Sequence, residues 1–140
     1  MMKLHAKGYC CAQVILILAL EAQGKINEDL VRSVGGLCFG INWSGEVCGA
    51  LSGGACLISL YAGKGSDEEV PDSQCLSMVG ELIEWFTIAA DDEYGGTRCH
   101  EILEKYPDRS VCSLIVVDTY KKCMEILVAH GFDPSVNKKS

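Results

Sequence analysis

The chain has 140 residues, of which 49% are hydrophobic, and a formal net charge of −7 at pH 7. This length suits a single domain over residues 1–140, and the apolar content excludes an intrinsically disordered chain. Because the charge is acidic, we expect neither nucleic acid nor a membrane as a partner.

The first apolar run, AQVILILAL, directly follows Cys10 and Cys11. It has the length of a signal-peptide core, but the two cysteines and the lack of a small-residue cleavage site in EAQGK argue against that interpretation. The run is also too short to span a bilayer. We therefore favour a buried first helix within residues 9–24, closed by Gly24, in a protein of the reducing cytoplasm.

The next two segments differ in their glycine content. NEDLVRSVG predicts a short helix that Asn27 caps, whereas GLCFGINWSG predicts a loop because glycines interrupt it. A longer helix is then expected from a cap at Ser44, with Glu46 in its first turn, to about Gly63.

An acidic linker, SDEEVPD, precedes the longest expected helix, QCLSMVGELIEWFTIAADD. Asp72 or Ser73 is its expected cap. Apolar residues recur every three or four positions along it, and this rhythm indicates a stripe that faces the core. The stripe consists of Leu76, Val79, Leu82, Ile83, Phe86 and Ala90.

Two more helices are expected near the C-terminus. Thr97 would cap RCHEILEKY, which Pro107 ends, and Asp108 or Ser110 would begin VCSLIVVDTYKKCMEILVAHG. The β-branched SLIVVDTY also suits a strand, but no second strand is available to pair with it. The whole pattern predicts an all-α fold, a compact bundle of about four main helices plus short helices. One face of the last helix would hold Ile115, Thr119, Met124 and Leu127.

Nine cysteines are present, and the odd number leaves at least one of them unpaired within the chain. Five predicted helix starts carry a cysteine, and unsatisfied N–H groups at such positions lower the pKa of a thiol. Arg98 beside Cys99 would lower it further. The competing interpretation is that free cysteines are small buried hydrophobic residues. The cysteines at helix starts are Cys10, Cys11, Cys48, Cys75, Cys99 and Cys112.

The remaining cysteines give weaker signals. Cys56 and Cys123 lie well inside predicted helices and are expected to face the core, whereas the role of Cys38 in the glycine-rich loop stays open. Adjacent residues on a helix point in different directions, so one of Cys10 and Cys11 is expected to serve packing.

Small residues follow Cys48 at helical spacing. Gly49 with Gly53, and Ala50 with Gly54, form pairs that let another backbone approach the helix closely. We therefore expect a second helix start, with its cysteine, to lie near Cys48.

Four stretches, CCAQ, EVCGALSGG, TRCHEIL and SVCSLIV, resemble the C-GCAxxG-C-C family, whose members are described as redox-active proteins of anaerobic bacteria and archaea. The resemblance covers residues 8–131, although the central motif here reads C-G-A-L-S-G. It implies a redox or iron–sulfur role, and the additional cysteines Cys10, Cys38, Cys56 and Cys75 leave the ligand set open. The family positions correspond to Cys11, to Cys48 with Gly49, Ala50 and Gly53, to Cys99, and to Cys112 or Cys123.

Three hypotheses stay open. In the first, the four cysteines are catalytic and cycle between dithiol and disulfide, a pair such as Cys11 with Cys48 attacking and resolving. A redox partner protein or a small thiol or electron carrier would exchange electrons with them. In the second, the same four thiolates are metal ligands that hold an iron–sulfur cluster or another metal ion. The residues concerned are Cys11, Cys48, Cys99 and Cys112, supported by Gly49, Gly53 and Arg98.

In the third hypothesis, the cysteines pack the core of a non-catalytic helical interaction module, which would present an apolar groove or a dimer interface. A homodimer is left open, and so is the question of whether the protein is an enzyme. Because neither a Ser/His/Asp order nor an H-E-x-x-H motif is present, any catalysis would rest on cysteine.

Overall fold

The computed structural model describes residue 4 and residues 6–136. Within this part of the chain there is no β-strand, so the predicted all-α fold is confirmed. None of the described helices is long and apolar enough to cross a membrane. The elements are α2 (Cys11–Ala22), α3 (Glu28–Val34), η1 (Gly35–Leu37), α4 (Cys38–Asn42), α5 (Gly49–Ala62), α6 (Cys75–Glu93), α7 (Cys99–Lys105) and α8 (Cys112–Ala129).

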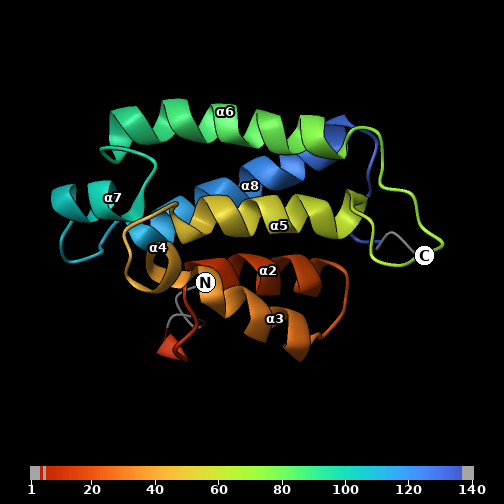
Figure 1. Cartoon of the computed structure of the whole chain (residues 1–140), viewed down its shortest axis with the longest axis horizontal. Coiled ribbons are helices and arrows are strands. Elements are labelled where there is room, and N and C mark those ends of the chain that lie inside the picture. Colours follow the sequence, from red (N-terminus) through yellow and green to blue (C-terminus); the bar gives the residue numbers. More distant parts are fainter. Residues whose placement is uncertain (1–3, 5, 137–140) are drawn as a thin grey trace.

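Helix α5 is the central element of the bundle. It packs against α2, α6 and α8, and Figure 1 shows it between α6 on one side and α2 with α3 on the other. Because helices surround it, α5 is buried along most of its length. Fully buried side chains from four helices form the shared core, among them Leu16, Leu57, Ile58, Leu82, Ile115 and Leu127.

The directions of the helices decide where their first residues lie. Helices α2, α5 and α8 begin at the same end of the bundle, next to α7, whereas α6 begins at the opposite end (Figure 1). Three long helices therefore present their N-termini to one region of the molecule.

The first apolar run is buried as predicted. The side chains of Val14, Ile15 and Leu16 have no exposed surface, and through them α2 packs into the core. The β-branched segment after Cys112 is helical, in agreement with the prediction, and its Ile115 and Val116 pack in the same core.

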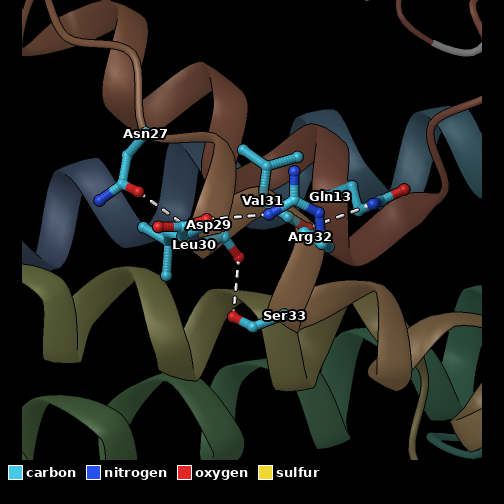
Figure 2. Close-up of polar contacts among 7 residues, drawn as sticks. All are labelled: Gln13, Asn27, Asp29, Leu30, Val31, Arg32 and Ser33. Atoms are coloured by element: carbon cyan, nitrogen blue, oxygen red, sulfur yellow. Dashed lines mark hydrogen bonds and ion pairs between the residues drawn. The ribbon is translucent and has the colours of Figure 1, made fainter.

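Helix α3 begins as the sequence predicts. The backbone N–H of Leu30 donates to the side-chain oxygen of Asn27 at 3.1 Å, which satisfies one of the free donors of the first turn (Figure 2). The amide of Gln13 donates to the carbonyl of Val31 at 3.1 Å and ties α2 to α3.

The caps expected for four helices were wrong, since α6 and α8 begin after Gln74 and Val111 without a side-chain cap, and neither Ser44 nor Thr97 caps the helix that follows it. The Ser44 hydroxyl donates to the carbonyl of Gly40 at 2.6 Å, and α5 begins only at Gly49. Thr97 likewise does not cap α7, whose first turn uses Glu101 to accept from the N–H of Arg98. Both segments are held extended instead, because an antiparallel β-bridge pairs Val47 with Arg98.

The predicted core stripe of α6 is partly wrong. Leu76 is 84% exposed and Ile83 is 46% exposed, whereas Leu82, Phe86 and Ala90 are buried as expected. The stripe is rotated because α6 turns Cys75 and Met78 toward α5 and α8. Each exposed residue of the predicted stripe directly follows a buried residue in the sequence. One residue corresponds to a rotation of about 100° around a helix.

Candidate functional site

Cysteines stand at the helix starts, as the sequence predicts. Cys11, Cys75, Cys99 and Cys112 are the first residues of α2, α6, α7 and α8, and Cys48 directly precedes α5. Since α6 begins at the far end of the bundle, Cys75 is remote from the other starts (Figure 1). The end shared by α2, α5, α7 and α8 is therefore the candidate site.

A thiol–thiolate pair lies at this end. The side chains of Cys11 and Cys112 lie close enough to share a hydrogen bond, and this interaction is the main reason that the pKa of Cys112 falls from its ordinary value of 9.0 to about 6. The same contact, together with burial, raises the pKa of Cys11. Cys112 is thus the ionised member of the pair, and Cys11 is the neutral donor.

Arg109 stabilises the thiolate. Its guanidinium donates a hydrogen bond to Cys112 and adds an attractive charge, whereas burial and the carboxylate of Asp108 act in the opposite direction. Arg109 has a φ of +61° in the turn before α8. Its guanidinium lies 4.6 Å from the centre of the Phe39 ring, which fixes it from the other side. Sequence reasoning missed this residue, although it stands one helical turn before Cys112.

The supporting cation predicted from the sequence, Arg98, has different surroundings. Its guanidinium lies 4.0 Å from Glu46, and both side chains are more than half exposed. Burial has the largest effect on the pKa of Cys99 and raises it. The cation that acts in the opposite direction is Arg109.

Cys48 and Cys99 are brought together by the β-bridge that links their segments. The N–H of Cys48 donates to the carbonyl of Thr97 at 3.1 Å, and the N–H of Cys99 donates to the carbonyl of Glu46 at 2.7 Å. Burial and, less strongly, the charges of Cys112 and Cys99 raise the pKa of Cys48 to about 11, although hydrogen bonds from the backbone of Ala50 and Leu51 act in the opposite direction. All four predicted cysteines therefore gather close enough for their charges to interact.

The glycines of α5 allow this gathering. A Cβ atom at Gly49 would lie 3.5 Å from the Cβ of Cys11, and one at Gly53 would lie 2.6 Å from a side-chain carbon of Ile15 and 3.0 Å from the Cα of Ala12. A side chain at Gly53 would push α2 away from α5, whereas a Cβ at Gly49 would make ordinary contact and only a larger side chain would collide there. The predicted close approach of a second helix start is confirmed, and that helix is α2.

A disulfide joins Cys10 to Cys38, with a Cα–Cα distance of 5.9 Å. The sequence left both residues open, because a separation of 28 residues carries no pairing signal. Both cysteines are buried in a small cluster with Ala12. The bridge fastens the start of α2 to the start of α4.

Of the two cysteines expected in the core, one is there. Cys123 is fully buried, and its thiol donates to the carbonyl of Gly54 at 3.6 Å. Cys56 is only partly buried, on the side of α5 that the neighbouring helices do not cover completely.

The segment that begins at Cys38 is a left-handed turn and not a right-handed helix. Phe39, Gly40, Ile41, Asn42 and Trp43 all have positive φ angles, between 53° and 65°. This conformation is unfavourable for residues other than glycine. The turn stacks the ring of Phe39 on the ring of Trp43, with ring centres 4.0 Å apart. The guanidinium of Arg109 lies over both rings.

A cavity of about 600 Å³ opens beside this turn. Cys112 borders it together with both halves of the disulfide and with Arg109. The complete lining is Gly8, Tyr9, Cys10, Gln13, Gly35, Cys38, Phe39, Asp108, Arg109 and Cys112.

The positions of the described side chains give no support to the metal hypothesis. Among residues 4 and 6–136, no group of three or more His, Cys, Asp or Glu side chains is placed to hold a metal ion.

The fold and the site together define a helical bundle with a cluster of cysteines at one end. The family model described as "Putative redox-active protein (C_GCAxxG_C_C)" matches residues 9–126, and the chain belongs to this family. Searches of curated proteins and of solved structures gave no match. The matched range includes Cys11, Cys48, Cys99 and Cys112 as well as the Cys10–Cys38 disulfide.

Proposed function

We propose that this protein carries out thiol–disulfide exchange, with Cys112 as the attacking thiolate and Cys11 as the resolving thiol. The observation that carries the proposal is that Cys11 and Cys112 meet at one end of the bundle, where Cys112 borders a cavity together with Arg109. A thiolate is the nucleophile in disulfide exchange, and a neighbouring thiol is what resolves the intermediate.

The chemistry balances in two steps. The Cys112 thiolate attacks a substrate disulfide, forms a mixed disulfide and releases one substrate thiolate. Cys11 then loses its proton, attacks the sulfur of Cys112 and releases the second substrate thiol. The protein ends with a Cys11–Cys112 disulfide, and two electrons have passed to the substrate.

Cys48 and Cys99 have a supporting role in this proposal. Burial raises the pKa of both thiols, so they stay neutral near pH 7 and add no repulsive charge next to Cys112. Arg98 would contribute by holding Glu46 and the bridged segment in place.

The proposal extends to partners and location. A redox partner protein or a small thiol or electron carrier would supply and remove the electrons, and the cytoplasm would keep the pair reduced. Nucleic acid and membranes are not expected to bind, because the chain carries a net charge of −7. A homodimer is compatible with the same chemistry.

The test is trapping by alkylation during an anaerobic redox titration. As the potential rises, we expect the thiols of Cys11 and Cys112 to be oxidised together, so that neither can be alkylated. Cys112→Ser should abolish this transition. Cys56→Ser is the matched control, since Cys56 is partly buried and stands outside the cluster. An unchanged number of free thiols at every cytosolic potential would overturn the proposal.

The two other hypotheses give different outcomes in companion measurements. An iron–sulfur cluster or a bound metal ion would appear in the UV–visible spectrum and in metal analysis of protein purified without oxygen. An interaction module with packing cysteines would leave Cys112 inert toward a bulky thiol reagent under native conditions.

A further inference from the structure

The Cys10–Cys38 disulfide borders the cavity onto which the Cys112 thiolate opens. Both of its cysteines and Cys112 line the same space of about 600 Å³. The thiol exchange proposed above uses only Cys11 and Cys112, so this second sulfur pair has no part in it.

The two sulfur pairs are also joined through their neighbours. Cys10 caps α2, whose first residue is Cys11, the hydrogen-bond donor to Cys112. On the other side, Cys38 directly precedes Phe39, whose ring contacts the guanidinium of Arg109. The disulfide is therefore connected from two directions to residues that touch the Cys112 sulfur.

We propose that Cys10–Cys38 is a second redox pair, which accepts two electrons from the Cys11–Cys112 dithiol inside the protein. This inference rests on the proposed function. It gives the protein two dithiol/disulfide couples, so that a fully reduced chain can deliver two pairs of electrons.

The internal exchange needs no other reactant. The Cys112 thiolate attacks one sulfur of the Cys10–Cys38 bond, a mixed disulfide forms, and the other cysteine of the bridge leaves as a thiolate. Cys11 then gives its proton to that thiolate and attacks the sulfur of Cys112. The Cys11–Cys112 bond forms, the mixed disulfide breaks, and the second bridge cysteine becomes a thiolate.

The first test traps the mixed disulfide. In Cys11→Ser the resolving thiol is missing, so oxidised protein incubated without oxygen should accumulate Cys112 bonded to Cys10 or Cys38. Trypsin places these sulfurs in the peptides 8–25, 33–64 and 110–121, and fragmentation of the linked, alkylated peptides by mass spectrometry distinguishes Cys38 from Cys48 and Cys56, which share its peptide. The control, Cys11→Ser combined with Cys112→Ser, should keep only the original bridge. Absence of any bond to Cys112 would contradict the relay.

The second test measures the reoxidation of reduced Cys10 and Cys38 by hydroxyethyl disulfide. A relay through Cys112 predicts that Cys112→Ser slows formation of the Cys10–Cys38 bond tenfold or more, whereas Cys56→Ser leaves the rate unchanged. If the Cys10–Cys38 bond forms at the same rate in Cys112→Ser as in the natural chain, the relay is overturned. This holds even when Cys112 of the natural chain reacts with the reagent. Loss of the Cys112 reaction itself would instead overturn the proposed function.

Discussion

At the scale of single residues, the site depends on the difference between two thiols that share one hydrogen bond. Cys112 is ionised because Cys11 and Arg109 donate to it, while Cys11 keeps its proton because it is buried beside that charge. This difference is the basis on which we propose attack by one cysteine and resolution by the other.

The role of Arg109 predicts a pH dependence. In the natural chain, alkylation of Cys112 by iodoacetamide should rise with pH around its pKa of about 6 and then level off. Arg109→Gln should move this midpoint upward, toward 9.0, and the rate at low pH should fall about tenfold for each pH unit that the midpoint moves. The other groups that act on Cys112 are Cys11 and Asp108, and Cys48 acts on Cys11.

Arg98→Gln is the matched control for this measurement, because its side chain is exposed and paired with Glu46. We expect it to leave the midpoint of Cys112 unchanged. An equal change of midpoint in both variants would show that general charge, and not the hydrogen bond from Arg109, sets the reactivity of Cys112.

At the scale of elements, close backbone contact positions the thiols. Helix α5 approaches α2 through Gly49 and Gly53, and the left-handed turn after Cys38 packs Gly40 against Cys99. The absence of side chains at Gly53 and Gly40 is therefore a condition for the cluster to form.

Gly53→Leu should damage the fold and the thiol site together. Its side chain would collide with Ile15 and Ala12, so we expect a loss of stability of about 1–3 kcal/mol or more. The same displacement of α2 should weaken the hydrogen bond from Cys11, and the alkylation midpoint of Cys112 should rise. Gly49→Leu should act in the same direction.

The control is Gly80→Ala on α6, where an added Cβ would meet nothing within 4 Å. Since alanine favours a helix, this variant should gain about 0.5–1 kcal/mol in urea unfolding and keep the midpoint of Cys112. A normal midpoint in a folded Gly53→Leu protein would refute the idea that α2–α5 contact positions Cys11.

Gly40→Ala tests the left-handed turn. Gly40 has a φ of +61°, and an added Cβ would lie 2.6 Å from the Cβ of Cys99 and 2.8 Å from the backbone nitrogen of Glu46. The left-handed backbone alone costs about 1–2 kcal/mol for alanine, so thermal unfolding should begin at a clearly lower temperature. Displacement of α7 should also make Cys99 react faster with iodoacetamide.

Gly36→Ala serves as the comparison, because an added Cβ there meets nothing within 4 Å and the backbone is not left-handed. Its stability should stay within about 0.5 kcal/mol of the natural chain. Equal effects of the two substitutions would mean that the turn adapts to side chains and does not constrain Cys99.

At the scale of the whole molecule, the site exists because three long helices begin at one end of the bundle while α6 runs the other way (Figure 1). The Cys10–Cys38 bridge strengthens this end, since it ties the start of α2 to the turn that carries Phe39 and Trp43. Stability and redox state are thereby linked.

This link predicts a stability difference between oxidised and reduced protein. Closing a loop across 28 residues reduces the entropy of the unfolded chain by an amount worth about 3–4 kcal/mol. Cys10→Ser combined with Cys38→Ser should lose a similar amount in urea unfolding of oxidised protein, and a reductant should affect its stability much less than that of the natural chain. No difference between the oxidised proteins would show that the bridge does not constrain unfolding.

The sequence by itself determined the helices and the cysteines at their starts. Periodicity, the Asn27 cap and the glycines after Cys48 are local signals, and they correctly predicted an all-α chain with close helix contact near that residue. The buried face of α6 was less predictable, because which side of a helix meets the core depends on its neighbours.

Only the tertiary structure decided which sulfurs meet. The contact of Cys11 with Cys112, the bridge from Cys10 to Cys38 and the role of Arg109 join residues far apart in the chain. They depend on the directions of the helices and on a left-handed turn that strong local preferences oppose. Helix starts can be read from the chain, but the pairing of thiols requires packing that brings those starts to one place.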